Sequence, residues 1–521
     1  MKKNFIAFVS LLFLFASAMP VLTNANEKSA PPSMYVTPPA PQFSDAERQA
    51  ELARRRAAVF SRMQPNSVMI LWSAAPRNYA GDVDFMYRQE NNLYYLTSLR
   101  QGNSTLVLIK NADGAGAEFL FLPKRNPAAE TWNGKMYSNE DAARLSGLKT
   151  IIDSNELPAF LQSLKDKKDF SSKNGAKIGA ANIQNVYLLI PEDERDGDGI
   201  AEFNRENDFA KTLSGYKIIN ARAGENDIFG SLRQVKSAYE LKLLQHAIDI
   251  TTEAQERAMA TAKNVKWEYE TQAEIEYIFR RRNADYWGYP SIVGCGPNAT
   301  TLHYEESQGA VKSGDLLLMD VGAEYDHYTA DVTRTFPVNG KFSKEQADIY
   351  QIVYDAQEAA AKTIKPDVNS GEPGKAATRI LKQGLAKLGL ITAPDAKYQF
   401  MSNGKLYEDS QYRIWFMHGW GHWLGMNVHD VGAYGIPLKA GMVTTNEPGI
   451  YVREDALDYL PDTPANRDFI AKVKPAFEKY KNIGVRIEDD MLVTPTGVEW
   501  MTKNLPRSIA DIEAFMAQAG K

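Results

Sequence analysis

The chain has 521 residues, of which 44% are apolar and 24% charged, with a formal net charge of −5. These ordinary values exclude disordered, collagen-like and disulfide-dense proteins. The single cysteine, Cys295, excludes an intrachain disulfide and is expected to be a small buried residue rather than a nucleophile. The acidic balance excludes nucleic acid as an expected partner, because phosphate contacts need a basic face. The length exceeds what one hydrophobic core usually serves, so two domains are expected.

The first 25 residues resemble a secretory signal peptide. Lys2 and Lys3 precede an apolar run at residues 5–18, and cleavage is expected after Ala18 or Ala25. The alternative is a membrane anchor, but the run is shorter than the roughly 20 residues needed to span a bilayer. We therefore expect an exported protein, periplasmic or secreted, without stable membrane insertion. Removal of residues 1–25 leaves 58 basic and 65 acidic residues, a net charge of −7.

Residues 26–43 are proline-rich and lack periodicity, which is typical of an extended tether. Residues 44–225 are expected to form an α/β domain, because strand-like and helix-like patterns alternate there. The expected strands begin at Ser67, Asn92, Ser104, Ala117, Lys149 and Ala176, and the expected helices begin at Ser44, Ser138 and Asn155.

Residues 226–521 are expected to form an α+β domain. Ser237 and Glu240 make a capping box at the start of a long amphipathic pattern. Short β segments separated by glycine and asparagine follow Trp287. Further helices are expected at residues 271–282, 344–364 and 376–389.

Two aspartates mark the most informative segment of the chain. Strand-like runs flank Tyr325 and Asp326, and a two-residue loop centred there would place Asp320 opposite Asp331, with Cα atoms about 5.5 Å apart. Burying two adjacent carboxylates is unfavourable unless a cation neutralises them. The alternative is a solvated polar hairpin, which the apolar residues 316–319 argue against. A metal between the two carboxylates is the favoured interpretation.

Three of the six histidines lie within twelve positions: His418, His422 and His429. Histidine suits both metal ligation and proton transfer near neutral pH. An i, i+4 pair can share a metal on a helix, but Gly419 and Gly421 disfavour a regular helix here. The spacing therefore does not decide which histidine is a ligand.

Two further carboxylates extend the set. Glu447 precedes Pro448, and Glu488 is expected on an alternating strand, on the same face as Arg486, which is its alternative ion-pair partner. Four carboxylates and one imidazole would balance two divalent cations, and oxygen-rich ligation favours a hard ion such as Mn²⁺. Two such ions can generate hydroxide from one water near pH 7. Hydrolysis is therefore the expected reaction.

In this order, five segments resemble the pita-bread metallopeptidases, and within them aminopeptidase P and prolidase. The segments are residues 292–304, 315–342, 416–432, 441–451 and 484–490. The segments RRRAAVFSRMQPNS, YRQENNLYYLT and LVLIKN resemble the N-terminal domain of aminopeptidase P. The resemblance implies a pita-bread C-terminal domain and covers nearly the whole mature chain.

The resemblance also implies a role for each site residue. Two divalent metal ions per subunit, Mn²⁺ being favoured, would be bound by Asp320, Asp331, His422, Glu447 and Glu488. Asp331 and Glu488 would bridge the ions, and Glu447 would also shuttle a proton. Pocket and catalytic positions would be His303, His418, His429, Tyr451 and Arg486, with His429 assisting at the scissile amide.

By resemblance, the chain is a metallo-aminopeptidase that hydrolyses the Xaa-Pro bond through a metal-bridging hydroxide and releases the N-terminal residue of peptides with proline second. The alternative is Xaa-Pro dipeptidase (prolidase), which uses an arginine in the interval where residues 430–446 contain none. Methionine aminopeptidase fits less well with an exported chain, and an inactive binding module fits less well with the intact ligand set. A homo-oligomer, dimer or tetramer, is also implied.

Four features depart from the family pattern. Trp420 and Gly421 stand between two of the histidines, Asn446 precedes Glu447, and Tyr94 occupies the place of a tryptophan. The segment 454–482 is longer than the minimal family loop and is expected to form an amphipathic helix at the mouth of the cleft.

Overall fold

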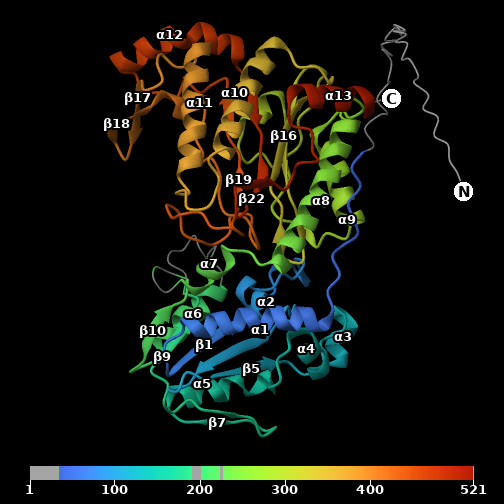
Figure 1. Ribbon diagram of the computed structural model, residues 1–521, viewed down its shortest axis with the longest axis vertical. Helices are drawn as coiled ribbons and strands as arrows, with labels where there is room; N and C mark the ends of the chain where they lie inside the picture. Colours follow the sequence, from blue (N-terminus) through green and yellow to red (C-terminus); the bar gives the residue numbers. More distant parts are fainter. Residues whose placement is uncertain (1–33, 191–200, 223, 225–226, 520–521) are drawn as a thin grey trace, which may run out of the picture.

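The computed structural model describes residues 34–190, 201–222, 224 and 227–519, arranged as two lobes (Figure 1). The predicted signal peptide and residues 26–33 of the predicted tether lie outside the described residues, as do residues 225 and 226, where the domain boundary is predicted. Within the described part of the chain, no helix combines the length and apolar character needed to cross a membrane.

The lower lobe in Figure 1 is built on one mixed sheet. Its central strand β1 (Ser67–Trp72) is antiparallel to β4 and parallel to β9. The strand order is β10 (Lys217–Asn220), β9 (Asn185–Leu188), β1, β4 (Thr105–Lys110), β5 (Gly116–Leu122) and β6 (Ile151–Asp153). The predicted α/β class of this lobe is confirmed.

Helices cover both faces of this sheet because its strands are apolar on both sides. Met69 of β1 packs with Val59 of α1 (Asp45–Arg62), whereas Ile70 packs with Phe160 of α5 (Leu157–Lys165). Successive strand residues point to opposite faces. The predicted N-cap Ser44 begins α1 with a capping box.

The remaining elements of this lobe are short. They are β2 (Asn78–Ala80), β3 (Val83–Asp84), α2 (Asn91–Thr97), α3 (Pro127–Asn133), α4 (Asn139–Ser146), β7 (Phe170–Ser171), β8 (Lys177–Ile178), α6 (Ala201–Lys211) and α7 (Ile228–Arg233).

The strand predicted from Asn92 is wrong, because this segment forms helix α2. The side chain of Glu90 accepts a hydrogen bond from the Leu93 backbone and caps the helix. Residues 92–97 are all buried, and a short run that is apolar on every side fits a buried helix as well as a strand. The helix carries Tyr94 to the upper lobe, where its ring stacks on His327 and its hydroxyl donates to Asp326.

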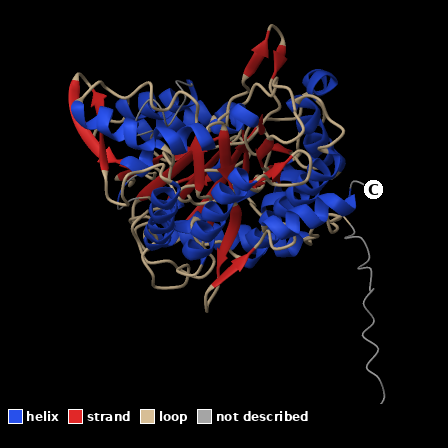
Figure 2. Ribbon diagram, turned by 90° about the horizontal axis from the view of Figure 1, so that it is seen from above, coloured by secondary structure: helices blue, strands red, loops and turns tan. Residues whose placement is uncertain are grey.

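The upper lobe has strands at its centre and helices around them (Figure 2). The predicted capping box at Ser237 begins α8 (Ala238–Thr261). Cys295 is buried, and burial raises the pKa of its thiol to about 12, as expected of a structural residue. The other helices are α9 (Glu268–Arg281), α10 (Lys344–Ala361), α11 (Glu372–Leu388), α12 (Pro464–Tyr480) and α13 (Ile509–Ala519).

Short antiparallel ladders form the centre of this lobe, which confirms its α+β class. One three-stranded sheet contains β12 (Ile292–Cys295), β13 (Leu316–Val321) and β16 (Val332–Pro337), and another contains β19 (Val443–Asn446), β22 (Asp489–Val493) and β23 (Val498–Trp500). The others pair β20 (Gly449–Val452) with β21 (Ile483–Arg486), and β11 (Tyr286–Trp287) with β14 (Ala323–Tyr325) and β15 (Tyr328–Thr329).

The insertion at residues 454–482 contains the predicted amphipathic helix, α12. Its apolar face packs Phe477 against Trp415, with ring centroids 6.1 Å apart. Asn466 exchanges two hydrogen bonds of 2.9 Å with the backbone of Gln399, in the hairpin of β17 (Lys397–Ser402) and β18 (Lys405–Ser410). Among the described residues, none of this insertion lines either cavity around His418. The expected place at the mouth of the cleft is therefore not where α12 lies.

The described part of the predicted tether docks onto α8. The Thr37 backbone donates to Glu253 over 2.8 Å, and the Tyr35 hydroxyl donates to Asp249 over 2.9 Å. The Tyr35 backbone also donates to Glu256. An extended segment is thus fixed to a helix of the upper lobe by carboxylates.

Replacing Glu256 is expected to change how stability depends on pH. Burial raises the pKa of Glu256 to about 7 from 4.5, so the folded state favours its protonated form. That contribution is present below pH 4.5 and is lost as pH rises through 7. Glu256→Gln should raise the urea midpoint relative to the unaltered chain at pH 8 but not at pH 4.5. Glu499→Gln, at an exposed position, should shift both midpoints equally; the same pattern for Glu256→Gln would contradict the prediction.

Candidate active site

Asp320 and Asp331 come from a hairpin whose register differs from the expected one. The two-residue loop is Asp326 and His327, with φ of 50° and 68°, values that suit a type I′ turn. Asp320 therefore pairs with Thr333, and the expected pairing of Asp320 with Asp331 is wrong. Because Asp331 is two residues from Thr333, both aspartates still project from one face. The single-face prediction is confirmed.

Glu447 and Glu488 come from a second ladder. Asn446 pairs with Asp489 at the end of one sheet, and Gly449 pairs with Arg486 at the start of the next. Both pairs have the same register, which places Glu447 across from Glu488 in the break between the sheets. The two glutamates thus lie just outside the strands, whereas Glu488 was expected within one.

The two ladders are held together by hydrogen bonds beside the carboxylates. The Thr333 hydroxyl donates to Glu488 over 2.6 Å, and the Glu488 backbone donates to the Thr333 carbonyl over 3.1 Å. Arg486 donates to Asp320 and lies 3.8 Å from Glu488, so it pairs with both acids. The Tyr289 hydroxyl lies 2.5 Å from one oxygen of each aspartate.

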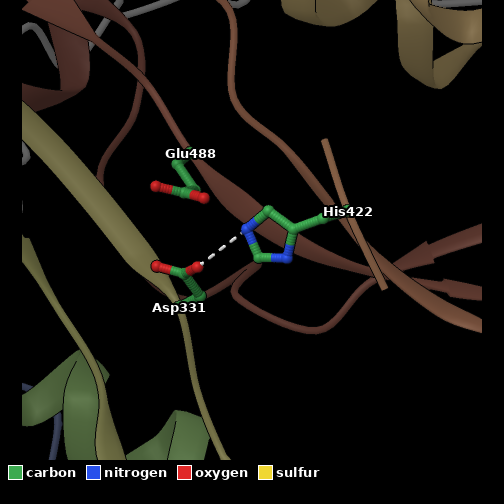
Figure 3. A group of neighbouring side chains, drawn as sticks. All are labelled: Asp331, His422 and Glu488. Atoms are coloured by element: carbon green, nitrogen blue, oxygen red, sulfur yellow. Dashed lines mark ion pairs between the residues drawn. The ribbon is translucent and has the colours of Figure 1, made fainter. Parts of the chain in front are cut away.

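His422 is the histidine that lies among the carboxylates. Its Nε2 is 3.2 Å from an Asp331 oxygen and 3.3 Å from a Glu447 oxygen. Figure 3 shows its ring directed at Asp331, with Glu488 alongside. One ligand atom from each of these three residues lies within 4.8 Å of the others. The structure thus brings His422 together with Asp331 and Glu488. Sequence spacing alone did not decide which histidine would lie there.

The other predicted site residues surround this group. His303, His418, His429 and Arg486 line the same cavity of about 590 Å³ as the five predicted ligands. His429 meets His422 edge to face, with ring centroids 4.2 Å apart. Tyr451 is buried behind them and hydrogen-bonds to His418 Nε2 and Arg486 Nη1, each over 2.8 Å.

The charges of the site are strongly coupled. Burial raises the pKa of Asp331 to about 7, and the adjacent Asp320 adds to the rise. Burial also raises the pKa of Glu488 well above its usual range. Burial acts in the same direction on Glu447, but the hydrogen bond with His418 and the charge of His422 outweigh it and lower the pKa of Glu447 to about 2.

The donor set fits divalent cations. Four carboxylates, three of them buried and Glu447 half-buried, face one another with Arg486 and His422 as the basic groups among them, and such an excess of negative charge is unfavourable without a cation. Oxygen and imidazole donors suit Mn²⁺, Zn²⁺ and related ions. The five residues predicted as ligands would hold two ions here.

Two residues that support the site were not predicted from the sequence. Tyr289 touches both aspartates and precedes β12, whose Ile292 pairs with Asp320. Arg334 is fully buried and pairs with Asp489 over 2.6 Å. An aromatic hydroxyl beside a proline, and an arginine inside an apolar strand, were the available signals in the sequence.

Comparisons with known proteins agree with this geometry. Residues 242–495 match metallopeptidase family M24, and residues 52–171 match the aminopeptidase P N-terminal domain. The chain is 35% identical to Xaa-Pro aminopeptidase of Haemophilus influenzae over 472 residues, which cover 89% of this chain and 97% of the relative. It is 33% identical to Xaa-Pro aminopeptidase of Escherichia coli over 483 residues, which cover 92% and 100%.

A solved structure also resembles this one along most of its length. Aminopeptidase P from E. coli with the inhibitor Pro-Leu superposes with a TM-score of 0.73 at 32% sequence identity, covering 92% of this chain and 99% of that one. Its likeness extends over both lobes, which neither family match does alone. From these relatives and the geometry of the site, we conclude that the chain belongs to metallopeptidase family M24, among its Xaa-Pro aminopeptidases.

Proposed function

We propose that this chain is a metal-dependent aminopeptidase that hydrolyses the Xaa-Pro bond and releases the N-terminal residue of peptides with proline second. The observation that carries the proposal is the convergence of Asp331, His422 and Glu488 donor atoms within 4.8 Å, in a cavity lined by three further histidines. The relatives named Xaa-Pro aminopeptidase supply the substrate class.

The site residues would divide the chemistry among them. When bound, two divalent ions would activate a water molecule as nucleophile and polarise the scissile carbonyl. One oxygen of Glu447 lies 3.4 Å from His418 Nδ1, and this carboxylate would accept the proton that the attacking water loses. Tyr451 fixes the orientation of His418 through its 2.8 Å hydrogen bond.

Two histidines remain for the substrate. Burial lowers the pKa of His429, so its ring is neutral near pH 7 and can share a hydrogen bond with the scissile amide. His303 lines the same cavity beside Leu302. Arg486 orients Asp320 and Tyr451 together rather than binding substrate directly.

A peptide-length assay tests the proposed function. We expect the Mn²⁺-supplemented chain to hydrolyse an Xaa-Pro tripeptide at least about tenfold more efficiently, in kcat/KM, than the matching Xaa-Pro dipeptide, a difference of about 1.4 kcal/mol. Residues beyond proline add binding that a dipeptide lacks. Liquid chromatography of the released N-terminal residue would measure both rates, and a preference for the dipeptide would assign the chain to prolidase chemistry instead.

The metal, the compartment and the assembly are also proposed. Mn²⁺ is favoured by the oxygen-rich donors, and export to the periplasm or medium is favoured by residues 1–25. A homo-oligomer is supported by apolar side chains exposed around β2 and β3, Tyr79, Val83, Phe85 and Met86. Metal analysis of the purified chain, N-terminal sequencing after expression and light scattering test these three proposals separately.

A further inference from the structure

A second cavity, of about 680 Å³, adjoins the metal cavity. Helix α11 and residues 412–420 form its walls, and the two cavities share His418 and Gly419. His418 Nδ1 lies 3.4 Å from Glu447. An occupant of the second cavity is thus separated from the metal-binding residues by one side chain.

The two cavities have opposite charge. Four cations line the second one, Lys375, Arg379, Lys382 and Arg413, against one carboxylate, Asp395. Three of these cations are spaced i, i+4 and i+7 along α11, which places them on one face of the helix. The metal cavity is lined instead by five carboxylates and one arginine.

The cations of the second cavity are weakly paired. Among the described residues, Arg379 makes no hydrogen bond or ion pair, and Lys382 pairs over 3.1 Å with Asp395, whose side chain is 93% exposed. Arg413 lies 3.8 Å from Asp409, and Lys375 pairs over 2.7 Å with Glu372, both of whose side chains are exposed. Ion pairs with at least one exposed partner contribute little, so these charges can bind an anionic ligand.

Trp420 connects the cavity wall to the metal site. Its indole packs so tightly on α11 that a Cβ added at Gly374 would lie 2.3 Å from Trp420 Cδ1. Its carbonyl accepts a hydrogen bond of 2.8 Å from the Glu447 backbone. The cationic face of α11 that lines the second cavity therefore has a fixed position relative to Glu447.

We propose that this cavity is a subsite for the C-terminal part of the substrate and that it selects carboxylates there. The inference rests on the proposed function. An aminopeptidase binds one residue before the scissile bond, so an extended cavity beside the site is left for the residues after that bond. Each extended residue spans about 3.3 Å. Carboxylates in that part of the peptide would match the four cations of the second cavity, and such complementarity sets specificity.

Three peptides distinguish the carboxylates of acidic side chains from the carboxylate at the end of the peptide. They are Ala-Pro-Ala-Glu-Glu-amide, Ala-Pro-Ala-Gln-Gln-amide and Ala-Pro-Ala-Gln-Gln with a free carboxylate. The kcat/KM for each peptide is divided by the kcat/KM for Ala-Pro-Ala-amide. We expect kcat/KM for the acidic amide to exceed that for the neutral amide at least about fivefold, or about 1 kcal/mol, and the preference to shrink in high salt. A preference for the free carboxylate alone would assign the subsite to the chain terminus.

A double variant locates the preference in the cavity. In Arg379→Gln/Lys382→Gln the ratio between acidic and neutral peptides should fall to within about twofold of unity. Lys472→Gln removes an exposed cation on α12 and should keep the full ratio. Equal cleavage of all three peptides by the unaltered chain, or an unchanged ratio in the double variant, would overturn the inference.

Failure of the proposed function would give a different result. In that case Ala-Pro-Ala-amide itself would not be hydrolysed by the metal-loaded chain. Fluorescence anisotropy of labelled Pro-Ala-Glu-Glu-amide then decides on the subsite alone: weaker binding to the double variant than to Lys472→Gln supports it, and equal binding overturns it.

Discussion

Asp331→Asn is expected to reduce kcat/KM on an Xaa-Pro tripeptide by more than about 100-fold, because changes even to outer residues of metal sites cost 10–100-fold. The asparagine keeps the size of the side chain but removes a negative charge 3.2 Å from His422. With one carboxylate fewer, the remaining ligands neutralise less of the positive charge of the bound metal ions. Steady-state kinetics and metal content per chain, measured on the same sample, check the prediction.

A surface carboxylate supplies the control for this variant. Asp468→Asn, on the exposed side of α12, should retain activity within about twofold, as surface changes usually do. Chelation should abolish the activity of the unaltered chain, and Mn²⁺ should restore it. Full activity after chelation, or a fully metal-loaded Asp331→Asn chain that loses less than about tenfold, would contradict the two-metal mechanism.

Arg334→Leu is expected to destabilise the upper lobe by about 3–5 kcal/mol, the usual cost of removing one partner of a buried ion pair. Arg334 is fully buried, pairs with Asp489 over 2.6 Å and donates to the carbonyls of Glu488 and Pro506. The leucine would leave Asp489 without its cation. Urea unfolding followed by tryptophan fluorescence measures the loss.

An ion pair at the surface and a double variant serve as controls for this prediction. Lys344→Ala breaks a 2.9 Å pair with Asp348 at the surface and should shift the urea midpoint far less than Arg334→Leu, because exposed ion pairs are weak. Arg334→Leu/Asp489→Leu should recover part of the lost stability, because the unpaired charge is gone. A loss from Arg334→Leu as small as that from Lys344→Ala would show that the buried pair has no special weight.

Much of the fold was predictable because its signals are local. The capping boxes at Ser44 and Ser237 depend on residues three positions apart, and the strand from Ser67 is a short apolar run that includes β-branched residues. The segment from Asn92 was mispredicted because burial on every side removes the periodicity that separates a helix from a strand.

The site was predictable in part for the same reason. Asp320 and Asp331 lie in one hairpin, so their shared face followed from strand alternation, although the turn lies one residue later than expected. The left-handed conformations of Asp326 and His327 determine that position. Nothing local predicted the contact of Tyr289 with both aspartates.

The sequence by itself predicted the class of each lobe and the shared face of Asp320 and Asp331 and, through resemblance, the five ligands and the family. Only the tertiary structure placed His422 rather than His418 between Asp331 and Glu447, and Glu447 across from Glu488. Only it joined the basic face of α11 to the cavity beside them. The physical reason is that these contacts join ladders and helices distant in sequence, where spacing along the chain carries no information about distance in space.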